Sequence, residues 1–124
     1  MSEEPKTHKD LDVWKRSIDL VEDVYGITEG FPQEELYGLT NQLRRAAVSI
    51  PSNIAEGAAR DSKKEFIQFL HIALSSLSEV ETQLVISERL GYLDDLDGVE
   101  ERIRTVRKLL LGLIRHLRTR VGKG

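Results

Sequence analysis

Apolar residues recur at steps of three and four positions along most of the chain, and nothing in the pattern indicates a strand. The spacing predicts four helices, over about residues 9–27, 35–58, 62–90 and 97–120. The predicted core positions are, in chain order, Leu11, Trp14, Ile18, Val21, Tyr25, Leu39, Leu43, Ala46, Ala47, Ile50, Ile54, Phe66, Leu70, Ala73, Leu77, Val80, Leu84, Val99, Ile103, Val106, Leu110, Leu113 and Leu117. Short connections between long amphipathic helices predict an all-α fold, an antiparallel up-down-up-down four-helix bundle.

Residues that stop and start helices separate these segments. Gly30, Phe31 and Pro32 break the first from the second. Residues 62–65, Ser-Lys-Lys-Glu, form a capping box, in which a hydroxyl and a carboxylate bind free backbone amides at the start of the third helix. The acidic group at residues 94–97 suits the start of the fourth helix, where carboxylates meet free amides and the positive end of the helix dipole.

The second predicted helix carries a proline, Pro51, in its interior. Such a proline removes one backbone hydrogen bond and crowds the carbonyl of Ala47, at a cost of roughly 3 kcal/mol. A polar stripe runs along the same helix opposite its apolar face: Gln42, Arg45, Ser49, Ser52, Asn53 and Glu56. Two interpretations are open. Polar side chains or water satisfy the freed carbonyl and stabilise a kink, or the stripe forms a buried polar network at a subunit interface.

The length and composition favour one compact unit. Residues 1–124 are expected to form a single domain with flexible ends, about 1–8 and 121–124. The absence of cysteine excludes disulfides and thiolate zinc sites. The polar N-terminus carries no apolar signal segment, and no apolar run approaches the ~18 residues of a membrane span. We therefore expect a soluble protein with no membrane contact, most simply cytoplasmic.

The net charge of -3 hides a strong asymmetry along the chain. Residues 1–40 contain four Lys and Arg against ten Asp and Glu, and residues 65–101 contain one against nine. Residues 41–64 contain five against two, and residues 102–124 contain eight Lys and Arg and no acidic residue. This separation indicates a partner of opposite charge or an internal neutralising contact.

The basic residues of the last helix form the first candidate binding surface. On a helical projection they fall within an arc of about 100°, away from the apolar face. This basic ridge consists of Arg104, Arg107, Lys108, Arg115 and Arg118. It suits contact with a phosphate backbone, which depends on charge density and needs no base-specific geometry. The alternative, equally open, is a solvated face whose cations pair with acidic surfaces of the first or third helix.

A second group of cations lies around the turn between the second and third helices. Its members are Arg44, Arg45, Arg60, Lys63 and Lys64. Two of them fall in the first turn of the third helix, where the dipole disfavours cations, and this placement hints at an anionic partner. Ordinary surface lysines beside a capping box are the simpler interpretation.

Catalysis and metal binding have little support. The histidines His8, His71 and His116 lie far apart in sequence, and no Glu-x-x-His pair exists to build a di-iron bundle site. The string DDLDGVEE lacks the ligand spacing of a calcium loop, and nothing resembles a nucleophile elbow or a phosphate-binding glycine loop. We therefore expect a protein that is not an enzyme and has no cofactor and no metal.

Three segments carry a resemblance to a known family: LTNQLRRAAVSIPSNIAEG (39–57), KEFIQFLHIALSSLSEVETQL (64–84) and LGYL (90–93). From about Leu11 to Leu117 the chain resembles the bacterial 23S rRNA intervening-sequence proteins. The resemblance implies a left-handed antiparallel four-helix bundle that forms a ring-shaped homo-oligomer, with a pentamer expected. It supplies no catalytic residue, and its signature positions here are Ser49, Pro51, Asn53, Glu56 and Gly57.

The resemblance also bears on partners. Members are often encoded within insertions in 23S rRNA genes, and a related branch is the accessory protein of diversity-generating retroelements, which binds a reverse transcriptase and nucleic acid. The leading hypothesis is a non-enzymatic homo-oligomeric bundle that binds RNA or another nucleic acid electrostatically through the basic ridge. The alternative is a scaffold that docks a protein such as a polymerase, and a third hypothesis is an enzyme with its site at a subunit interface.

Overall fold

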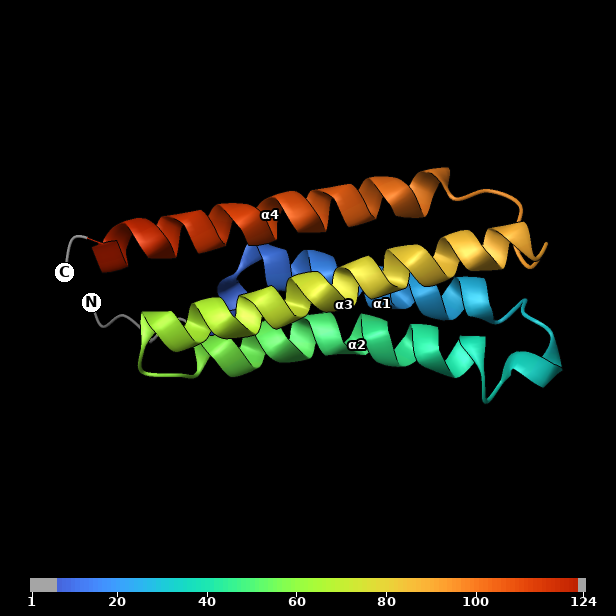
Figure 1. The fold of residues 1–124 in the computed structure, drawn as a ribbon, viewed down its shortest axis with the longest axis horizontal. Helices are drawn as coiled ribbons and strands as arrows, with labels where there is room; N and C mark the ends of the chain where they lie inside the picture. Colours follow the sequence, from blue (N-terminus) through green and yellow to red (C-terminus); the bar gives the residue numbers. More distant parts are fainter. Residues whose placement is uncertain (1–6, 123–124) are drawn as a thin grey trace.

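The computed structural model describes residues 7–122, and within this range it contains helices and no strand (Figure 1). Four long helices form a bundle: α1 (Asp12–Thr28), α2 (Leu39–Ala58), α3 (Lys63–Arg89) and α4 (Asp97–Gly122). Two short 3-10 turns, η1 (His8–Asp10) and η2 (Gln33–Glu35), precede α1 and α2. The prediction of an all-α fold with four helices is confirmed.

The expected flexible ends fall largely on residues 1–6 and 123–124, which lie outside the described part of the chain. Within that part, Thr7 accepts a hydrogen bond from the backbone of Lys9 and begins the turn η1. The last helix continues to Gly122, two residues beyond its predicted end.

The core is one apolar cluster to which all four helices contribute. Its fully buried large side chains are Leu20, Val24, Leu43, Ile50, Ile54, Leu70, Leu77, Val80, Leu84, Ile103, Val106 and Leu110. The predicted inward positions of α2, α3 and α4 fall in or against this cluster. On α4 the predicted Leu110 and Leu117 are buried together with Ile114, which was not predicted, while the predicted Leu113 is half-buried.

The predicted core face of α1 is confirmed only in part: Leu11, Trp14 and Val21 pack against the core but are partly buried, and other residues of the helix are buried more deeply. Val13, Leu20 and Val24 are buried, whereas Tyr25, predicted inward, is 41% exposed. The buried face also includes two hydroxyl residues, Ser17 and Thr28. Each donates a hydrogen bond to a carbonyl of its own helix, at 2.7 Å for Ser17 and 2.8 Å for Thr28, so the hydroxyls are buried with a partner. A hydropathy pattern does not register these positions as core.

The predicted helix starts are present. The Ser62 hydroxyl accepts a hydrogen bond from the Glu65 amide at 3.1 Å, and Asp95 accepts one from the Asp97 amide at 2.8 Å. The predicted capping box is only half formed, because the Glu65 carboxylate does not bind the Ser62 amide. The second helix begins at Leu39 rather than near Glu35, because residues 33–35 form a separate turn. Glu35 nevertheless contributes to it, since its carboxylate accepts the Leu39 amide at 3.0 Å.

The contact between α2 and α3 depends on a small residue, Gly57, in the last turn of α2. A Cβ atom on Gly57 would lie 2.8 Å from Phe66 Cδ1, 2.8 Å from Phe69 Cβ and 3.2 Å from the carbonyl oxygen of Phe66. Glycine therefore allows α3 to approach the last turn of α2 this closely. Pro51 lies buried inside α2, which continues through it as one helix.

Candidate nucleic-acid interface

The basic ridge of α4 divides into paired and unpaired cations. Arg104 forms an exposed ion pair with Glu101 on its own helix, with Nη1 and Oε2 3.0 Å apart. Arg107 reaches across to α3, where its Nη2 donates to Glu81 Oε1 at 2.8 Å. Lys108 and Arg115 are exposed and form no ion pair with a described residue. The ridge is therefore partly neutralised within the chain, in its first half.

Arg102, which the sequence analysis did not single out, is the best-anchored cation of α4. Its Nε donates to Asp23 at 2.6 Å, and its Nη1 lies 3.5 Å from Asp19. The hydrogen bond with Asp23 raises the pKa of Arg102, and the charges of Asp23, Asp19 and Glu22 act in the same direction. Arg102 thus joins α4 to α1. The one sequence feature that pointed toward this pair is the run of carboxylates on α1. Because Arg102 and Asp23 are 79 residues apart, local spacing does not predict that they meet.

The second predicted group of cations does not form one cluster. Arg44 lies near the start of α2, over the ring of Tyr25 at 4.5 Å, and its Nε donates to the Thr28 hydroxyl at 2.8 Å. Arg60 follows the end of α2 and pairs with Glu56 at 3.1 Å. Arg60 follows Arg44 by sixteen positions, and the helix from Arg44 to Ala58 alone spans roughly 21 Å. Arg45 belongs with Arg44, while Lys63 and Lys64 lie with Arg60.

The α2–α3 turn and the last turns of α4 lie at the same end of the bundle (Figure 1). A contact joins them: Arg118 Nη2 on α4 lies 3.1 Å from His71 Nε2 on α3. We call this region the basic end, defined by Lys63, Lys64, Arg115 and Arg118. The structure therefore brings together cations that the sequence placed in separate groups.

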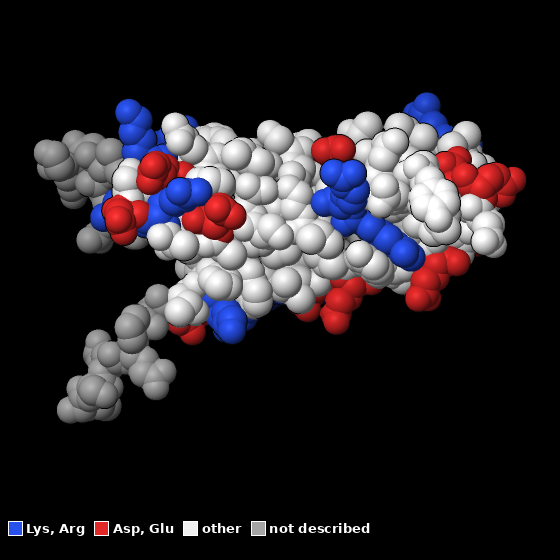
Figure 2. Space-filling model, turned by 90° about the horizontal axis from the view of Figure 1, so that it is seen from below, with Lys and Arg blue, Asp and Glu red and all other residues white. Residues whose placement is uncertain are grey.

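The opposite end of the bundle is acidic. The connecting segments there, residues 29–38 and 90–97, contain six carboxylates and no Lys or Arg: Glu29, Glu34, Glu35, Asp94, Asp95 and Asp97. We call this region the acidic end. Figure 2 shows mainly Asp and Glu at this end of one face, cations farther inward, and Asp and Glu mixed with Lys and Arg at the opposite end.

Side chains fasten the two connections of the acidic end to each other. Tyr92 donates its hydroxyl to Glu35 Oε2 at 3.0 Å, and its ring lies 5.4 Å from the ring of Phe31. The hydrogen bond with Glu35, together with partial desolvation and the charges of Glu35 and Glu34, raises the pKa of Tyr92. The same Glu35 carboxylate caps α2 through Leu39, so one side chain joins three elements.

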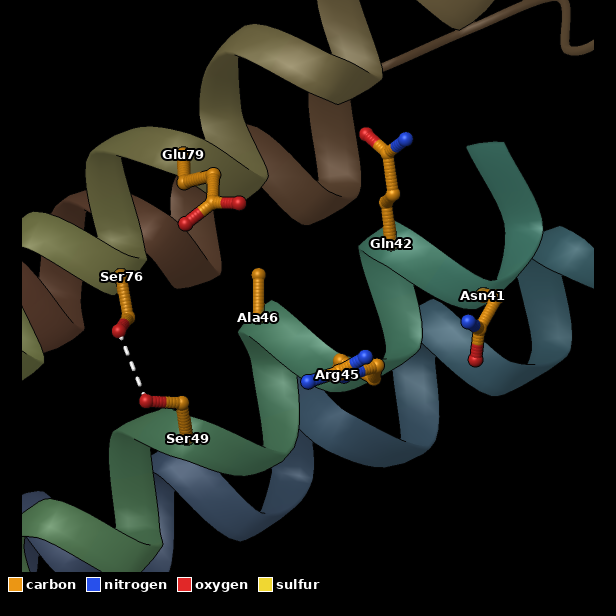
Figure 3. Close-up of a pocket in the computed structure, with 7 residues that line it drawn as sticks. All are labelled: Asn41, Gln42, Arg45, Ala46, Ser49, Ser76 and Glu79. Atoms are coloured by element: carbon orange, nitrogen blue, oxygen red, sulfur yellow. Dashed lines mark hydrogen bonds between the residues drawn. The ribbon is translucent and has the colours of Figure 1, made fainter. Parts of the chain in front are cut away.

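The polar stripe of α2 faces α3 of the same chain over part of its length. Ser49 and Ser76 are hydrogen-bonded through their hydroxyls at 2.9 Å (Figure 3). Asn53 donates to the Ser49 carbonyl at 2.8 Å and to the Ser49 hydroxyl at 2.9 Å. Gln83 donates to Gln42 at 3.3 Å, while its own Oε1 is buried without a partner among the described residues. The network connects two helices of one subunit, and the side chain of Asn53 binds the Ser49 carbonyl rather than that of Ala47.

Two hollows flank this stripe. One lies between α2 and α3, and its polar lining includes Arg45, Ser49, Ser76 and Glu79 (Figure 3). The other lies between α1 and α2, where Trp14, Ile18, Val21, Val48 and Pro51 give it an apolar lining. The signature proline therefore contributes to an apolar groove, and the signature serine to a polar one.

The histidines have packing partners or lie apart from one another. His8 lies edge-on to Trp14, with 5.2 Å between ring centroids, and His71 contacts Arg118. Within residues 7–122, no group of three or more His, Asp and Glu side chains is arranged to hold a metal ion. None of the helices in this range is both long and apolar enough to cross a membrane.

The comparisons with known proteins agree with this architecture. No curated protein matches the chain. A crystal structure of a protein of unknown function from the S23 ribosomal protein family of Bacteroides thetaiotaomicron is similar, with a TM-score of 0.76 and 24% identity, over 83% of this chain and 95% of the other. At this identity the likeness concerns the fold alone. The family model of the 23S rRNA-intervening sequence protein matches residues 9–112. Because the match spans most of its length, the chain belongs to the 23S rRNA-intervening sequence protein family.

Proposed function

We propose that this protein is a non-enzymatic, cytoplasmic RNA-binding bundle that contacts phosphate groups through the cations of α4. The observation that carries the proposal is the composition of residues 102–124, which contain eight Lys and Arg and no carboxylate. Lys108, Arg115 and Arg118 remain without a carboxylate partner among the described residues. Unneutralised cations on one helix attract a polyanion and release its condensed counterions on binding. The family's description, which names 23S rRNA intervening sequences, makes RNA the polyanion to test first.

We further propose that the antiparallel bundle assembles as a ring, with a pentamer expected. Support comes from apolar side chains that the single chain leaves uncovered, such as Val48 at 40%, Ile72 at 47% and Ile86 at 45% exposure. The apolar groove between α1 and α2 adds to this surface. A ring would present one basic surface per subunit, so individually weak phosphate contacts would act together. Light scattering of the purified protein would give the mass, and a monomer would contradict this part of the proposal.

The experiment for RNA binding is fluorescence anisotropy with nuclease-treated protein. A labelled 23S rRNA stem-loop and an unrelated RNA of the same length are titrated at low and at physiological salt. We expect binding at low salt that weakens steeply as salt rises, because the contact is electrostatic. Preference for the rRNA fragment would make it a specific ligand. Absence of binding at low salt would overturn the proposal.

A protein-docking scaffold is the second candidate function, and specific observations favour it. Arg102 and Arg107 pair with carboxylates of α1 and α3, as expected if the basic helix is neutralised within the chain. At the acidic end Tyr37 is 91% exposed, which is unusual for an aromatic residue without a partner surface. Copurification from a nuclease-treated lysate separates the two functions. A stoichiometric protein partner that persists without nucleic acid would favour the scaffold.

A further inference from the structure

We propose that the RNA contact lies at the basic end of the bundle rather than along the whole ridge, and that its ligand is the phosphate backbone of an RNA duplex. The inference rests on the proposed RNA-binding function and locates it. It assigns the contact to Lys64 on α3 together with Arg115 and Arg118 on α4. The cations nearer the acidic end, Arg102, Arg104 and Arg107, are assigned to internal ion pairs.

The side chains that α3 presents to α4 change from acidic to neutral along the contact between the two helices. Toward the acidic end α3 presents Glu81, which binds Arg107 at 2.8 Å. Toward the basic end the row of exposed residues that precedes Ser78 on α3 is neutral: Gln68, His71 and Ser75. Arg118 therefore meets an imidazole nitrogen at 3.1 Å, where a carboxylate would have neutralised it. The cations of this half keep their charge available for a ligand.

Three cations of the basic end lie on the sides of α3 and α4 that face the contact between the two helices. Lys64 precedes His71 by seven residues, two turns of helix, so both lie on one side of α3 about 10 Å apart. Arg115 precedes Arg118 by three residues and lies on the same side of α4. Because Arg118 contacts His71, the two rows face each other across the α3–α4 contact. Cations from two rigid helices thus form one surface.

The charges at the two ends of the bundle restrict how an RNA can lie along α4. The six carboxylates of the acidic end repel a polyanion, and the ion pairs beside them leave little free positive charge. An RNA that followed the full length of α4 would approach Asp97, Glu100 and Glu101 in its first turns. An RNA held at the basic end avoids them and meets there the carboxylates of the α2–α3 turn, Glu56, Asp61 and Glu65, of which Glu56 is paired with Arg60. The charge distribution therefore favours contact at one end.

The positions of the exposed aromatic side chains indicate which kind of RNA the basic end suits. Proteins that read single strands stack unpaired bases on exposed aromatic rings. Of the Phe, Tyr and Trp residues in the described range, the two exposed ones, Tyr25 in the last turns of α1 and Tyr37 before α2, lie toward the acidic end. Phe66 and Phe69, near the basic end, pack against Gly57. The basic end exposes two imidazoles, His71 and His116, and His71 is engaged by Arg118. The basic end therefore offers more charge than stacking surface, which suits a duplex backbone.

The test compares two triple variants with equal loss of charge. One carries Lys64→Gln, Arg115→Gln and Arg118→Gln, and the control carries Arg45→Gln, Arg89→Gln and Arg104→Gln. All six side chains are exposed, so both variants should fold, which circular dichroism and light scattering verify. Binding of a labelled RNA duplex, a single-stranded RNA and a DNA duplex is measured by anisotropy across a salt series.

We expect the basic-end variant to bind the RNA duplex at least about tenfold more weakly at low salt. The slope of log affinity against log salt should decrease in magnitude by about one per lost contact, thus by up to ~3 per subunit. The control variant should bind like the wild-type protein, and single-stranded RNA should bind more weakly than the duplex. The DNA duplex shows whether the contact depends on the A-form helix or on the phosphate charge that both duplexes share.

The contrary outcomes are distinct. Equal losses in both variants would show that net charge alone attracts the RNA, which overturns the location and leaves RNA binding intact. Loss in the control variant alone would move the site to the other half of the molecule. Tighter binding of the single strand would overturn the duplex assignment. No binding by the wild-type protein would overturn the proposed function itself, together with this inference.

Discussion

The two ends of the bundle hold their helices together in different ways. At the acidic end charged and polar side chains reach between elements, as in the contacts of Arg102 with Asp23 and of Tyr92 with Glu35. At the basic end α2 and α3 meet through the bare backbone of Gly57, against Phe66 and Phe69. The cations beside the acidic end, such as Arg102, thus serve to join helices, whereas the closest helix contact at the basic end depends on the small size of Gly57. This difference separates residues that maintain the fold from residues that remain available to a ligand.

The largest loss of stability is expected from a substitution that adds a side-chain atom to the tight helix contact at the basic end. In Gly57→Ala the new Cβ would lie 2.8 Å from Phe69 Cβ and 3.2 Å from the Phe66 carbonyl oxygen, so α3 must move away. We expect the free energy of unfolding to decrease by about 2 kcal/mol, in spite of alanine's better helix propensity. Urea unfolding followed by circular dichroism measures it.

The matched control is Gly26→Ala, also within a helix, where a Cβ meets nothing within 4 Å. Here the propensity gain should act alone and increase stability by up to about 1 kcal/mol. If the two substitutions changed stability equally, the close approach of α2 and α3 would not explain the glycine at position 57.

The next largest loss of stability is expected when a cation near the acidic end is replaced. Arg102→Met removes the bond to Asp23 and the pairing with Asp19, and it leaves two carboxylates of α1 without their partner. We expect a loss of about 1 kcal/mol at low salt, because these groups are partly exposed. The loss should shrink at high salt, unlike that of Gly57→Ala.

Arg104→Met serves as the comparison, since it lies two residues away on the same helix. Its pair with Glu101 is 66% and 70% exposed, so its replacement should change stability by less than about 0.5 kcal/mol. A loss as large as that of Arg102→Met would show that α4 is sensitive to any lost cation and that the cross-helix pairing is not special.

The same contrast explains how far the sequence alone could lead. Periodicity and capping residues predicted four helices and most inward positions of α2, α3 and α4, because these depend on neighbours three and four residues away. On α1 they identified residues at the edge of the core, such as Trp14 and Val21, but missed the most deeply buried face, which includes Ser17 and Thr28 with hydrogen bonds to their own helix. A buried hydroxyl of this kind has the same letter in the sequence as an exposed one.

The candidate site was only partly predictable, for a related reason. The excess of positive charge near the C-terminus is visible in the sequence. Which cations are neutralised depends on contacts such as Arg107 with Glu81, 26 residues apart, and Arg102 with Asp23, 79 residues apart. Helix rotation sets these pairs. A shift of one residue in either helix would leave a different set of cations free.

A smaller effect should appear at alkaline pH. The hydrogen bond that Tyr92 donates to Glu35 raises the pKa of the phenol above its ordinary value of 10.0, so the folded protein favours the neutral form. A group whose pKa is higher in the folded state stabilises the protein below its unfolded pKa, and this contribution is lost as pH rises through the folded value. The urea midpoint should therefore fall as pH rises above 10.0, the ordinary pKa of the phenol.

The variant Tyr92→Phe should lack this alkaline contribution and show a flatter midpoint over the same range. Tyr37→Phe provides the control, because Tyr37 is 91% exposed and forms no side-chain hydrogen bond with a described residue. If the flattening occurred in Tyr37→Phe instead, titration of Tyr92 would not be its source.

The smallest expected effect completes the comparison of the two ends. The triple variant Lys64→Gln, Arg115→Gln and Arg118→Gln removes three exposed cations, of which none pairs with a carboxylate among the described residues. Its free energy of unfolding should lie within about 0.5 kcal/mol of the wild-type value, since exposed unpaired charges contribute little. Glutamine keeps the first two methylenes of each side chain, and all three side chains are exposed, so packing changes little. A loss above 1.5 kcal/mol in urea unfolding would assign these cations to the fold, and the basic end would then resemble the acidic end, where positive charge serves structure.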